Sequence, residues 1–549
     1  MLGFYLIGRK QLTRACRWLM LLFILGVTPA YAVLTDSLTI GNAKALSLGN
    51  AVTADPPGID SINFNPAGLA QLKGRQVYLK TVAATFGIDL AFGDYNADRK
   101  NYLAQKQALG IFPDSYFYDE AHFSESKTQG ATLMLPVFGM TDIPVMLGPM
   151  GGASYNPPGS KITFATNVYA PMMVGFNRAD NDPGRWMGKR LAFSLLTYFS
   201  PSFAYQLNDE FSFGASLTFN YAGIGIELPF RSPHIGIEFL GELQNSICPG
   251  GIIPICGGEL GLYSRLGTLK FEVEDPMTLG FNLGLLWNPT PWLKLGMTYQ
   301  SPVPMKMHGD FTWDNSPSWV SFVSDLANSP GYAPIASLVS IFGWSLPEGQ
   351  TQVKGKAKLN MEMPEHFAVG LSLQLTPDIK LDADCKYTNW AVWNSIPVQF
   401  SQSIDFLRLA QIAQPDLVGR GGTGLTFPLG MKDTWNGAVG IEYRWNDNIV
   451  LRAGVEDRPS SISAAHDSPL LPIGDGYLYG TGMGLKLSSG AKLDFALGYF
   501  STSVNMPGGT SDLGNSTNPL LVIYNPYAGT DIKSKMTAIL FEFSYAQTF

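Results

Sequence analysis

Basic and acidic side chains share one face of several alternating segments in this sequence. In residues 379–392, apolar residues take every second position and charged residues stand between them. Alternation sends successive side chains of a strand to opposite faces, so the charged groups meet the same surroundings. Such cations can bind an anionic ligand group, but we expect most to pair with Asp382, Asp384, Glu442 or Glu456. The four candidate lumen cations, named for the interior that they would face, are Lys294, Lys386, Arg444 and Arg452.

Residues suited to catalysis or metal binding are sparse. The sequence has five histidines, none in a recognisable nucleophile motif, and no cluster of His and Cys with the spacing of a metal site. Gly480, Gly482 and Gly484 alternate along a strand-like segment that no helix follows, so they do not form a phosphate-binding loop. We therefore expect no enzymatic activity, no cofactor and no metal.

Amphipathic strands are the elements that must position the charged face. Residues 211–221 alternate strictly between large apolar residues and Ser, Gly, Thr or Asn. A soluble sandwich and a membrane barrel would both produce this alternation. Aromatic residues at segment ends favour the barrel, because they form girdles at membrane interfaces. Charged residues make up only 15% of the chain and aromatic residues 12%, while glycine is abundant at 59 residues, which also suits a barrel.

The segments and their connections predict an all-β transmembrane antiparallel barrel. Five tight turns rich in Asn, Asp, Pro and Gly alternate with much longer connections, which is typical of an outer-membrane barrel with its long loops facing outward. A longer connection at 141–160 has to serve as a sixth short-side turn. The fourteen predicted strands are 74–86, 129–140, 161–173, 189–206, 211–223, 267–287, 292–307, 354–375, 379–392, 434–445, 448–458, 476–488, 491–504 and 534–549.

The first 32 residues have the pattern of a secretory signal peptide. Four basic residues precede an apolar core of about ten residues, too short to span a membrane, and Ala30-Tyr31-Ala32 predicts cleavage before Val33. Removal of the four cations leaves 33 Lys and Arg against 44 Asp and Glu, a net charge of −11. An acidic exported chain argues against a nucleic-acid partner.

Three cysteines remain after the predicted cleavage. Cys248 and Cys256 bracket a short Pro/Gly-rich segment, and in an exported protein they form a possible disulfide. Whether they are bonded stays open. Cys385 lies on an apolar strand face and is interpreted as a small hydrophobic residue.

A short module rich in Gly, Asn and Pro precedes the first predicted strand. Its core consists of Asn65, Pro66, Ala67 and Gly68, the hatch motif. This motif resembles that of the FadL/TodX (OMPP1) family of outer-membrane transporters for long-chain fatty acids and other hydrophobic compounds. Further blocks resemble the family in order and spacing: residues 200–205, 293–301, 384–390, 433–435 and 451–454.

The resemblance implies a fold and a function. Residues 33–73 would form an N-terminal hatch that plugs the lumen of a monomeric barrel built from residues 74–549. The protein would take up hydrophobic molecules, with long-chain fatty acids as the default, and would release them sideways into the bilayer through a break in the third strand near Asn167 to Pro171. Pro171 has no N–H for the ladder, which agrees with a local disruption.

The outward loops would capture the substrate. In residues 308–353, apolar residues recur at the spacing of two short amphipathic helices, and Ile404, Leu407 and Ala410 suggest another. By resemblance, this loop and residues 224–266 form a hydrophobic groove. The candidate capture residues are Trp319, Phe322, Leu326, Leu338 and Phe342.

Other functions stay open at this point. The substrate could be an aromatic or alkane hydrocarbon rather than a fatty acid. The barrel could also be an outer-membrane lipid-hydrolysing enzyme, a polar porin or an adhesive scaffold. The predicted hatch separates the porin from the transporter, because deleting a plug should raise small-solute conductance.

Overall fold

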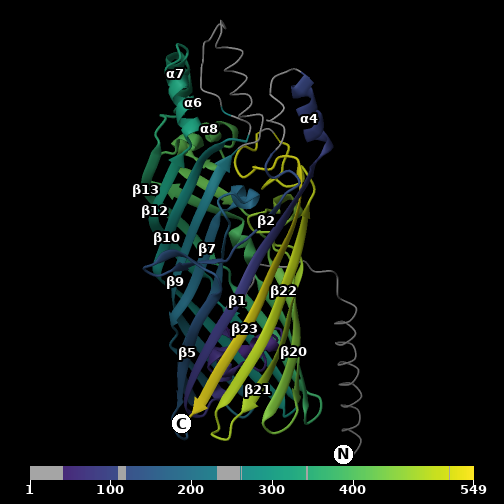
Figure 1. Ribbon diagram of the computed structural model, residues 1–549. Helices are drawn as coiled ribbons and strands as arrows, with labels where there is room; N and C mark the ends of the chain where they lie inside the picture. Colours follow the sequence, from purple (N-terminus) through teal and green to yellow (C-terminus); the bar gives the residue numbers. More distant parts are fainter. Residues whose placement is uncertain (1–40, 109–118, 232–259, 261–262, 342–343, 519) are drawn as a thin grey trace, which may run out of the picture.

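The computed structural model describes residues 41–108, 119–231, 260, 263–341, 344–518 and 520–549 (Figure 1). The predicted signal peptide, the cysteine pair Cys248 and Cys256, and Phe342 lie outside the described residues. Among the helices that are described, none is both long and apolar enough to cross a membrane.

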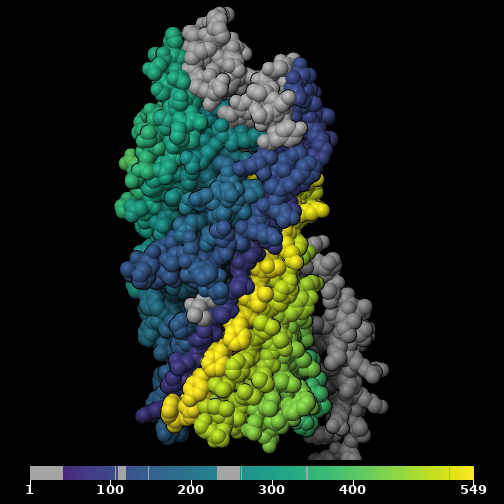
Figure 2. Space-filling view, in the orientation of Figure 1, coloured from purple at the N-terminus to yellow at the C-terminus, as the bar shows by residue number. Residues whose placement is uncertain are grey.

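The described chain forms a closed antiparallel barrel of 14 strands. The first strand pairs with the last from Gln76↔Thr548 to Tyr95↔Thr530, which closes the wall; both run diagonally side by side in Figure 2. The wall strands are β1 (Gly74–Tyr95), β5 (Met146–Asn156), β6 (Ile162–Asn177), β7 (Arg190–Phe199) with β8 (Ser202–Gln206), β9 (Phe211–Arg231), β10 (Arg265–Thr290), β11 (Leu293–Gln300) with β12 (Val303–Asn315), β13 (Gln352–Met363) with β14 (His366–Gln374), β15 (Ile379–Thr388), β19 (Thr434–Arg444), β20 (Ile449–Arg458), β21 (Gly476–Lys486), β22 (Lys492–Met506) and β23 (Thr530–Thr548).

The five predicted tight turns all join neighbouring wall strands, while the prediction for the second strand was wrong. That strand is β5, which pairs with β1 from Gly74↔Asn156 to Ala84↔Met146. The turn expected at 141–160 is therefore much shorter, since β6 begins at Ile162. Three glycines and Pro149 within β5 hid its strand character, because Gly and Pro usually mark loops.

Residues expected to form the second strand instead make a separate hairpin. β3 (Ala131–Leu135) and β4 (Gly139–Ile143) pair only with each other. Met134 and Met140 pack on Gly223 and Gly225 of β9. The residues that alternate with these glycines, such as Ile224, line the interior. The hairpin therefore lies on the outside of the barrel, and its own alternation explains why it was predicted as a wall strand.

Three predicted strands are interrupted near proline. The segment 189–206 divides at Pro201, 292–307 divides at Pro302, and 354–375 divides at Pro364. Proline has no N–H and cannot donate a ladder hydrogen bond, so the strand is interrupted there. The alternation of side chains continues past each proline, which is why each segment was predicted as one strand.

The outer surface has two bands. On β10, the outward residues Met277, Leu279 and Phe281 are exposed and apolar, with Leu279 47% exposed. Farther up the same strand the outward residues are Lys270 and Glu272. An apolar band bordered by charges marks the part of the wall that faces lipid.

The hatch occupies the lower half of the barrel, where its purple ribbon is visible between the strands in Figure 1. It contains α2 (Ala43–Ser47), η1 (Gly58–Asp60), α3 (Ser61–Phe64) and η2 (Pro66–Gln71), joined by short turns. Its apolar residues, including Leu48, Ile62 and Leu69, are almost fully buried against the wall.

Short elements cover the upper end. The predicted helices of 308–353 are present as α6 and α7, at the top of Figure 1, and the third predicted helix is α8. The remaining bounds are α4 (Ala97–Ala108), β2 (Glu125–Lys127), η4 (Pro183–Met187), α6 (Pro317–Ala327), α7 (Tyr332–Ile341), η5 (Trp390–Trp393), β16 (Ser395–Phe400), α8 (Asp405–Ala413), β17 (Val418–Gly419), η6 (Arg420–Gly422), β18 (Gly424–Pro428) and η7 (Ala464–His466).

Candidate functional site: hatch, apolar chamber and wall seam

The hatch motif lies directly against the barrel wall. Asn65 is fully buried, and its side-chain amide donates to the carbonyl oxygens of Thr53 (2.8 Å) and Leu285 (3.1 Å). Its side-chain oxygen accepts from the backbone N–H of Ala67 at 3.1 Å and so begins η2, with Pro66 at the first helical position. One asparagine therefore connects two parts of the hatch to β10.

Glycines of the wall make room for this motif. A Cβ on Gly284 would lie 2.1 Å from the side-chain oxygen of Asn65, and one on Gly214 would lie 2.3 Å from the backbone of Pro66. Elsewhere around the hatch, Gly454 and Gly480 allow the same close approach to α2. These positions were not predicted from the sequence. In the sequence, such a position can be recognised as a glycine on the inward-facing side of an alternating segment, where a polar residue would be expected.

Asp384 holds the middle of the hatch. One of its carboxylate oxygens accepts from the backbone N–H groups of Val52 and Thr53 (both 2.9 Å) and from the Thr53 hydroxyl (2.8 Å). Each bond involves a charged acceptor and is stronger than one between neutral groups. Asp384 on the acidic face of β15 thus anchors the plug.

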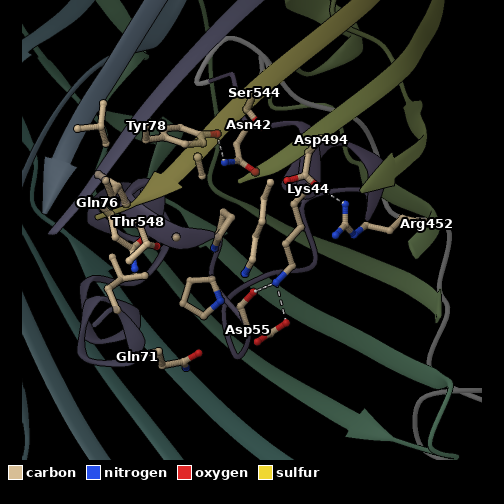
Figure 3. Close-up of a pocket in the computed structure, with 18 of the residues that line it drawn as sticks. Asn42, Lys44, Asp55, Gln71, Gln76, Tyr78, Arg452, Asp494, Ser544 and Thr548 are labelled. Carbon is tan, nitrogen blue, oxygen red and sulfur yellow. Dashed lines mark hydrogen bonds and ion pairs between the residues drawn. The ribbon is translucent and has the colours of Figure 1, made fainter. Parts of the chain in front are cut away.

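One candidate lumen cation, Arg452, lines a polar vestibule below the hatch, and a second, Lys294, pairs with Asp55 of that lining. The volume of the vestibule is 390 Å³, and Figure 3 shows its lining. Asp55 of the hatch pairs there with Lys294 (2.9 Å), Lys44 (2.7 Å) and Lys380 (2.6 Å). Arg452 pairs with two wall carboxylates, Glu442 and Asp494.

The other two cations have different surroundings. Lys386 is buried and pairs with Glu456 at 2.8 Å, and Glu456 also accepts from the hatch residue Asn50 at 3.0 Å. Arg444 is exposed at the lower rim, and no ion pair of its side chain is found within the described part of the chain. Three of the four cations are therefore occupied by carboxylates.

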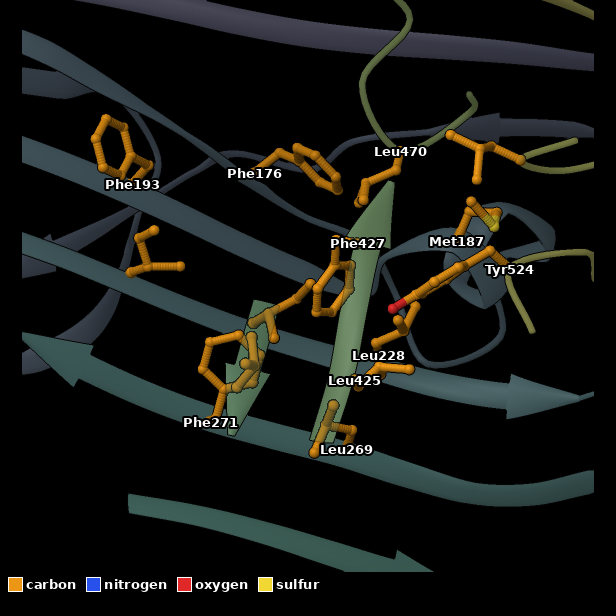
Figure 4. Close-up of a cluster of buried hydrophobic side chains, with 14 of the residues drawn as sticks. Phe176, Met187, Phe193, Leu228, Leu269, Phe271, Leu425, Phe427, Leu470 and Tyr524 are labelled. Carbon is orange, nitrogen blue, oxygen red and sulfur yellow. The ribbon is translucent and has the colours of Figure 1, made fainter. Parts of the chain in front are cut away.

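An apolar chamber lies above the hatch. Its described lining has no charged side chain, and Figure 4 shows Phe193, Phe271, Phe427 and Leu470 converging on it from different strands and loops. The cavity measures 90 Å³, which is small compared with the roughly 300–1,000 Å³ of ordinary ligand pockets. A molecule of the size of a fatty acid would have to displace side chains to fill it.

The wall between β5 and β6 is only partly closed. Their ladder runs from Gly151↔Val168 to Tyr155↔Phe164, so residues 146–150 of β5 pair with β1 but not with β6. On the other side of β6, the register with β7 shifts between Tyr169 and Met172, around Pro171. The predicted disruption of the third strand is thus present at the expected place. We call the paired part, residues 151–155 with 164–168, the seam.

The candidate capture residues divide into two groups. Trp319 and Phe322 are buried, 1% and 2% exposed, and their rings pack together; Trp319 also packs against Phe406 of α8. Leu326 is partly buried on α6, whereas Leu338 of α7 is 57% exposed. Only the α7 side of the predicted groove therefore offers free apolar surface among the described residues.

Known proteins resemble this chain over most of its length. A family model described as "Outer membrane protein transport protein (OMPP1/FadL/TodX)" matches residues 21–549. The long-chain fatty acid transport protein of Escherichia coli O6:H1 is 23% identical over 301 residues, covering 54% of this chain and 56% of that protein. The protein of the same name from Salmonella typhi is 22% identical over 298 residues, covering 54% and 57%. The chain thus spans a little over half the length of these curated relatives.

Solved structures share the fold. A Pseudomonas aeruginosa FadL homologue superimposes with a TM-score of 0.62 at 16% identity, covering 95% of this chain and 100% of the other. The Ralstonia pickettii toluene transporter TbuX gives 0.55 at 15%, covering 93% and 99%. The family model describes outer membrane transport proteins, and the activity of this chain is taken up as a proposal below. The family match over nearly the whole chain shows that it belongs to the OMPP1/FadL/TodX family of outer membrane transport proteins.

Proposed function

We propose that this barrel takes up long-chain fatty acids and releases them sideways into the outer membrane. The observation that carries the proposal is the order of environments inside the barrel. An apolar chamber lies above, a seated hatch with a polar vestibule lies below, and the wall is incompletely paired beside the hatch. Moving apolar surface into water costs about 25 cal/mol per Å². A solute that left through the vestibule would expose its apolar surface to water, whereas one that left through the wall would stay in apolar surroundings.

Capture begins at α7 in this proposal. Leu338 and Ile341 are 57% and 77% exposed, and a hydrophobic solute could rest on them before it enters the chamber. Trp319 and Phe322 fix the preceding helix α6 to the core of the upper end. The protein works as a monomer, and its partners are the solute and the membrane lipid.

The exit lies between β5 and β6, above the seam. Tyr169 faces inward at the register shift and belongs to the apolar cluster around the hatch, while Met172, three residues later, belongs to the cluster of the chamber. The two apolar clusters therefore meet on β6 beside the unpaired part of β5. Tyr169 and Met172 would offer apolar contacts to a solute that leaves the chamber on this path.

The first test is uptake in a deletion strain. Cells without the gene are complemented with the full chain and supplied with radiolabelled oleate. Restored uptake and growth on oleate support the proposal, and no restoration contradicts the fatty-acid assignment. Complementation by the chain with Leu359→Asn, a chamber substitution, should be weaker.

A neutral hydrocarbon is the second candidate substrate. The described lining of the chamber has no cation to hold a carboxylate, and three of the candidate lumen cations already bind carboxylates of the protein. Competition distinguishes the two substrates. Oleate uptake is measured with excess toluene or alkane, and hydrocarbon uptake is measured with excess oleate. If oleate is the stronger competitor, the fatty acid is favoured; if the hydrocarbon is the stronger competitor, the hydrocarbon is favoured.

A further inference from the structure

Asp60 of the hatch connects the two strands on either side of β5. One of its carboxylate oxygens binds the ammonium group of Lys80 on β1 at 2.6 Å and also accepts from the side-chain amide of Asn167 on β6. The other accepts from Asn42 at 2.7 Å. The side chains of Asp60 and Lys80 are each 1% exposed, so no water competes with these bonds.

The position of this cluster relative to the seam is specific. Asn167 pairs with Gly152, one step below the upper end of the ladder between β5 and β6. A Cβ on Gly152 would lie 2.8 Å from the side-chain oxygen of Asn167. The bare glycine thus lets the carboxylate reach across the inside of β5 to both neighbours. The cluster bridges the wall at the point where the unpaired part begins.

At this level the backbone of β6 pairs with β5 on one edge but lacks ladder pairs on its other edge, toward β7 and β8. Between its pairs with β8, which end at Ala165↔Ser202, and its pairs with β7, which start at Tyr169↔Thr197, no ladder pair is formed. The hydroxyl of Ser200 substitutes by accepting from the N–H of Asn167 (2.9 Å) and donating to its carbonyl oxygen (2.7 Å). The hatch contact through Asn167 therefore adds to the β5 ladder and the Ser200 bonds in fixing β6 here.

We propose that Asp60 is a latch: its carboxylate ties the seated hatch to β1 and β6 and so keeps the seam between β5 and β6 closed until the hatch moves. The proposal rests on lateral release as proposed above. A hatch that shifts with its solute withdraws Asp60 from Lys80 and Asn167 together, so that plug movement and wall opening become one event. Asp60 acts as a positioning residue and does not contact the solute.

The test measures access through the wall from the lipid. A cysteine is placed at Ala165, which faces inward behind the seam and is 9% exposed, in a background with Cys248 and Cys256 changed to Ser. A lipophilic maleimide is added to proteoliposomes, and labelling is followed by mass spectrometry. Native Cys385 on β15 is half-buried and pairs with Val369, at a position whose side chain faces the lipid. Its labelling provides the reference rate within each molecule.

Two hatch variants are compared on this background. Asp60→Asn weakens the latch, whereas Asp55→Asn removes a hatch carboxylate that is held by lysines away from β5 and β6. We expect Asp60→Asn to raise the labelling rate at position 165 about tenfold relative to Cys385, the factor expected for one lost hydrogen bond of ordinary strength. Asp55→Asn should leave that ratio unchanged.

Either of two results overturns the latch: an unchanged ratio in Asp60→Asn, or an equal rise in Asp55→Asn, which would indicate general loosening of the hatch. If Asp60→Asn fails to assemble, Asn167→Ala decides, since it keeps the ion pair with Lys80 and removes only the contact with β6. Labelling does not depend on transport. A raised ratio without uptake would contradict the proposed function alone, and uptake with an unchanged ratio would contradict the latch alone.

Discussion

The upper and lower halves of the lumen differ in the kind of contact that fills them. The chamber is lined by Phe, Leu, Ile, Met and Trp side chains whose packing is adaptable, whereas the hatch is held by charged hydrogen bonds to Asp384, Glu456 and the lysines around Asp55. Dispersion contacts tolerate a foreign apolar molecule, but a bonded polar network does not. This difference is the basis of the proposed lateral route: in that proposal, solute is accepted above and blocked below, and the exit lies between the two halves.

The largest expected effect comes from forcing the hatch off its wall. Gly284→Val would place a side chain on Asn65 and the Pro66 ring, at a site where even a Cβ comes within 2.1 Å. We expect this overpacking to destabilise the seated hatch by about 3 kcal/mol, which raises the ratio of displaced to seated hatch roughly a hundredfold. Planar-bilayer recordings should show a large rise in small-ion conductance. Gly437→Val is the control, because nothing lies within 4 Å of a Cβ there. Equal conductance in both variants would contradict the claim that close packing at Gly284 keeps the hatch seated.

A polar group in the chamber should act on uptake and leave the hatch seated. Leu359 lines the chamber and is 2% exposed, and Leu359→Asn would leave an amide without water. We expect a penalty of about 2 kcal/mol, roughly thirtyfold in solute occupancy, read as slower oleate uptake without added conductance. Lys358→Asn, on the exposed side of the same strand, should take up oleate at the parent rate. Equal loss in the two variants would show that the chamber lining is not the site.

A smaller effect is expected where the hatch meets β15. Asp384→Asn keeps an oxygen for the backbone of Val52 and Thr53 but loses the charge that strengthens these bonds. We expect hydrogen exchange at these two amides to accelerate roughly fivefold, for about 1 kcal/mol. Asp382→Asn, which accepts no bond from the hatch backbone, is the matched control. Exchange that is unchanged in Asp384→Asn would remove β15 from the anchoring scheme.

The smallest expected effect is a pH dependence of the stability of the loop 459–475 at the upper end of the barrel. Burial and the nearby Asp475 carboxylate raise the pKa of Asp467 to about 7. The folded loop therefore favours the protonated carboxyl, and its stability falls as pH rises from about 4 toward and through 7. Because Leu470 and Leu471 of the same loop line the chamber, protease cleavage within residues 459–475 should be faster at pH 8 than at pH 6. Asp467→Asn should abolish the difference, and a difference that persists would assign it to another group.

Local patterns were enough to predict most of the wall. Segments such as β9 alternate over many residues, and turns such as Asn446 to Asn448 have the chemistry of a hairpin, so each carries its own signal. β5 does not, because its glycines allow close approach to β1 and β6 but have low strand propensity. The hairpin β3–β4 alternates like a wall strand, and only its missing partners reveal that it lies outside.

Contacts between distant parts could not be predicted in the same way. Most of the lumen cations were expected to pair with acids of the barrel, but the partner of Lys294 is Asp55 of the hatch, 239 residues away in the sequence. The partner of Asp60 on β6 depends on the register of β5 and on where the ladder stops. Such pairs follow from barrel closure and strand stagger, which no local segment encodes.

The most direct test of the account is to map the path of the solute itself. A diazirine-bearing fatty acid is supplied to the folded protein in lipid, photoactivated during uptake, and its adducts are located by mass spectrometry. Lateral release predicts adducts at chamber residues such as Phe193 and then on β5 and β6 around Met150 and Tyr169. Adducts at the vestibule residues Lys44, Lys380 or Arg452, with none on β5 and β6, would contradict it.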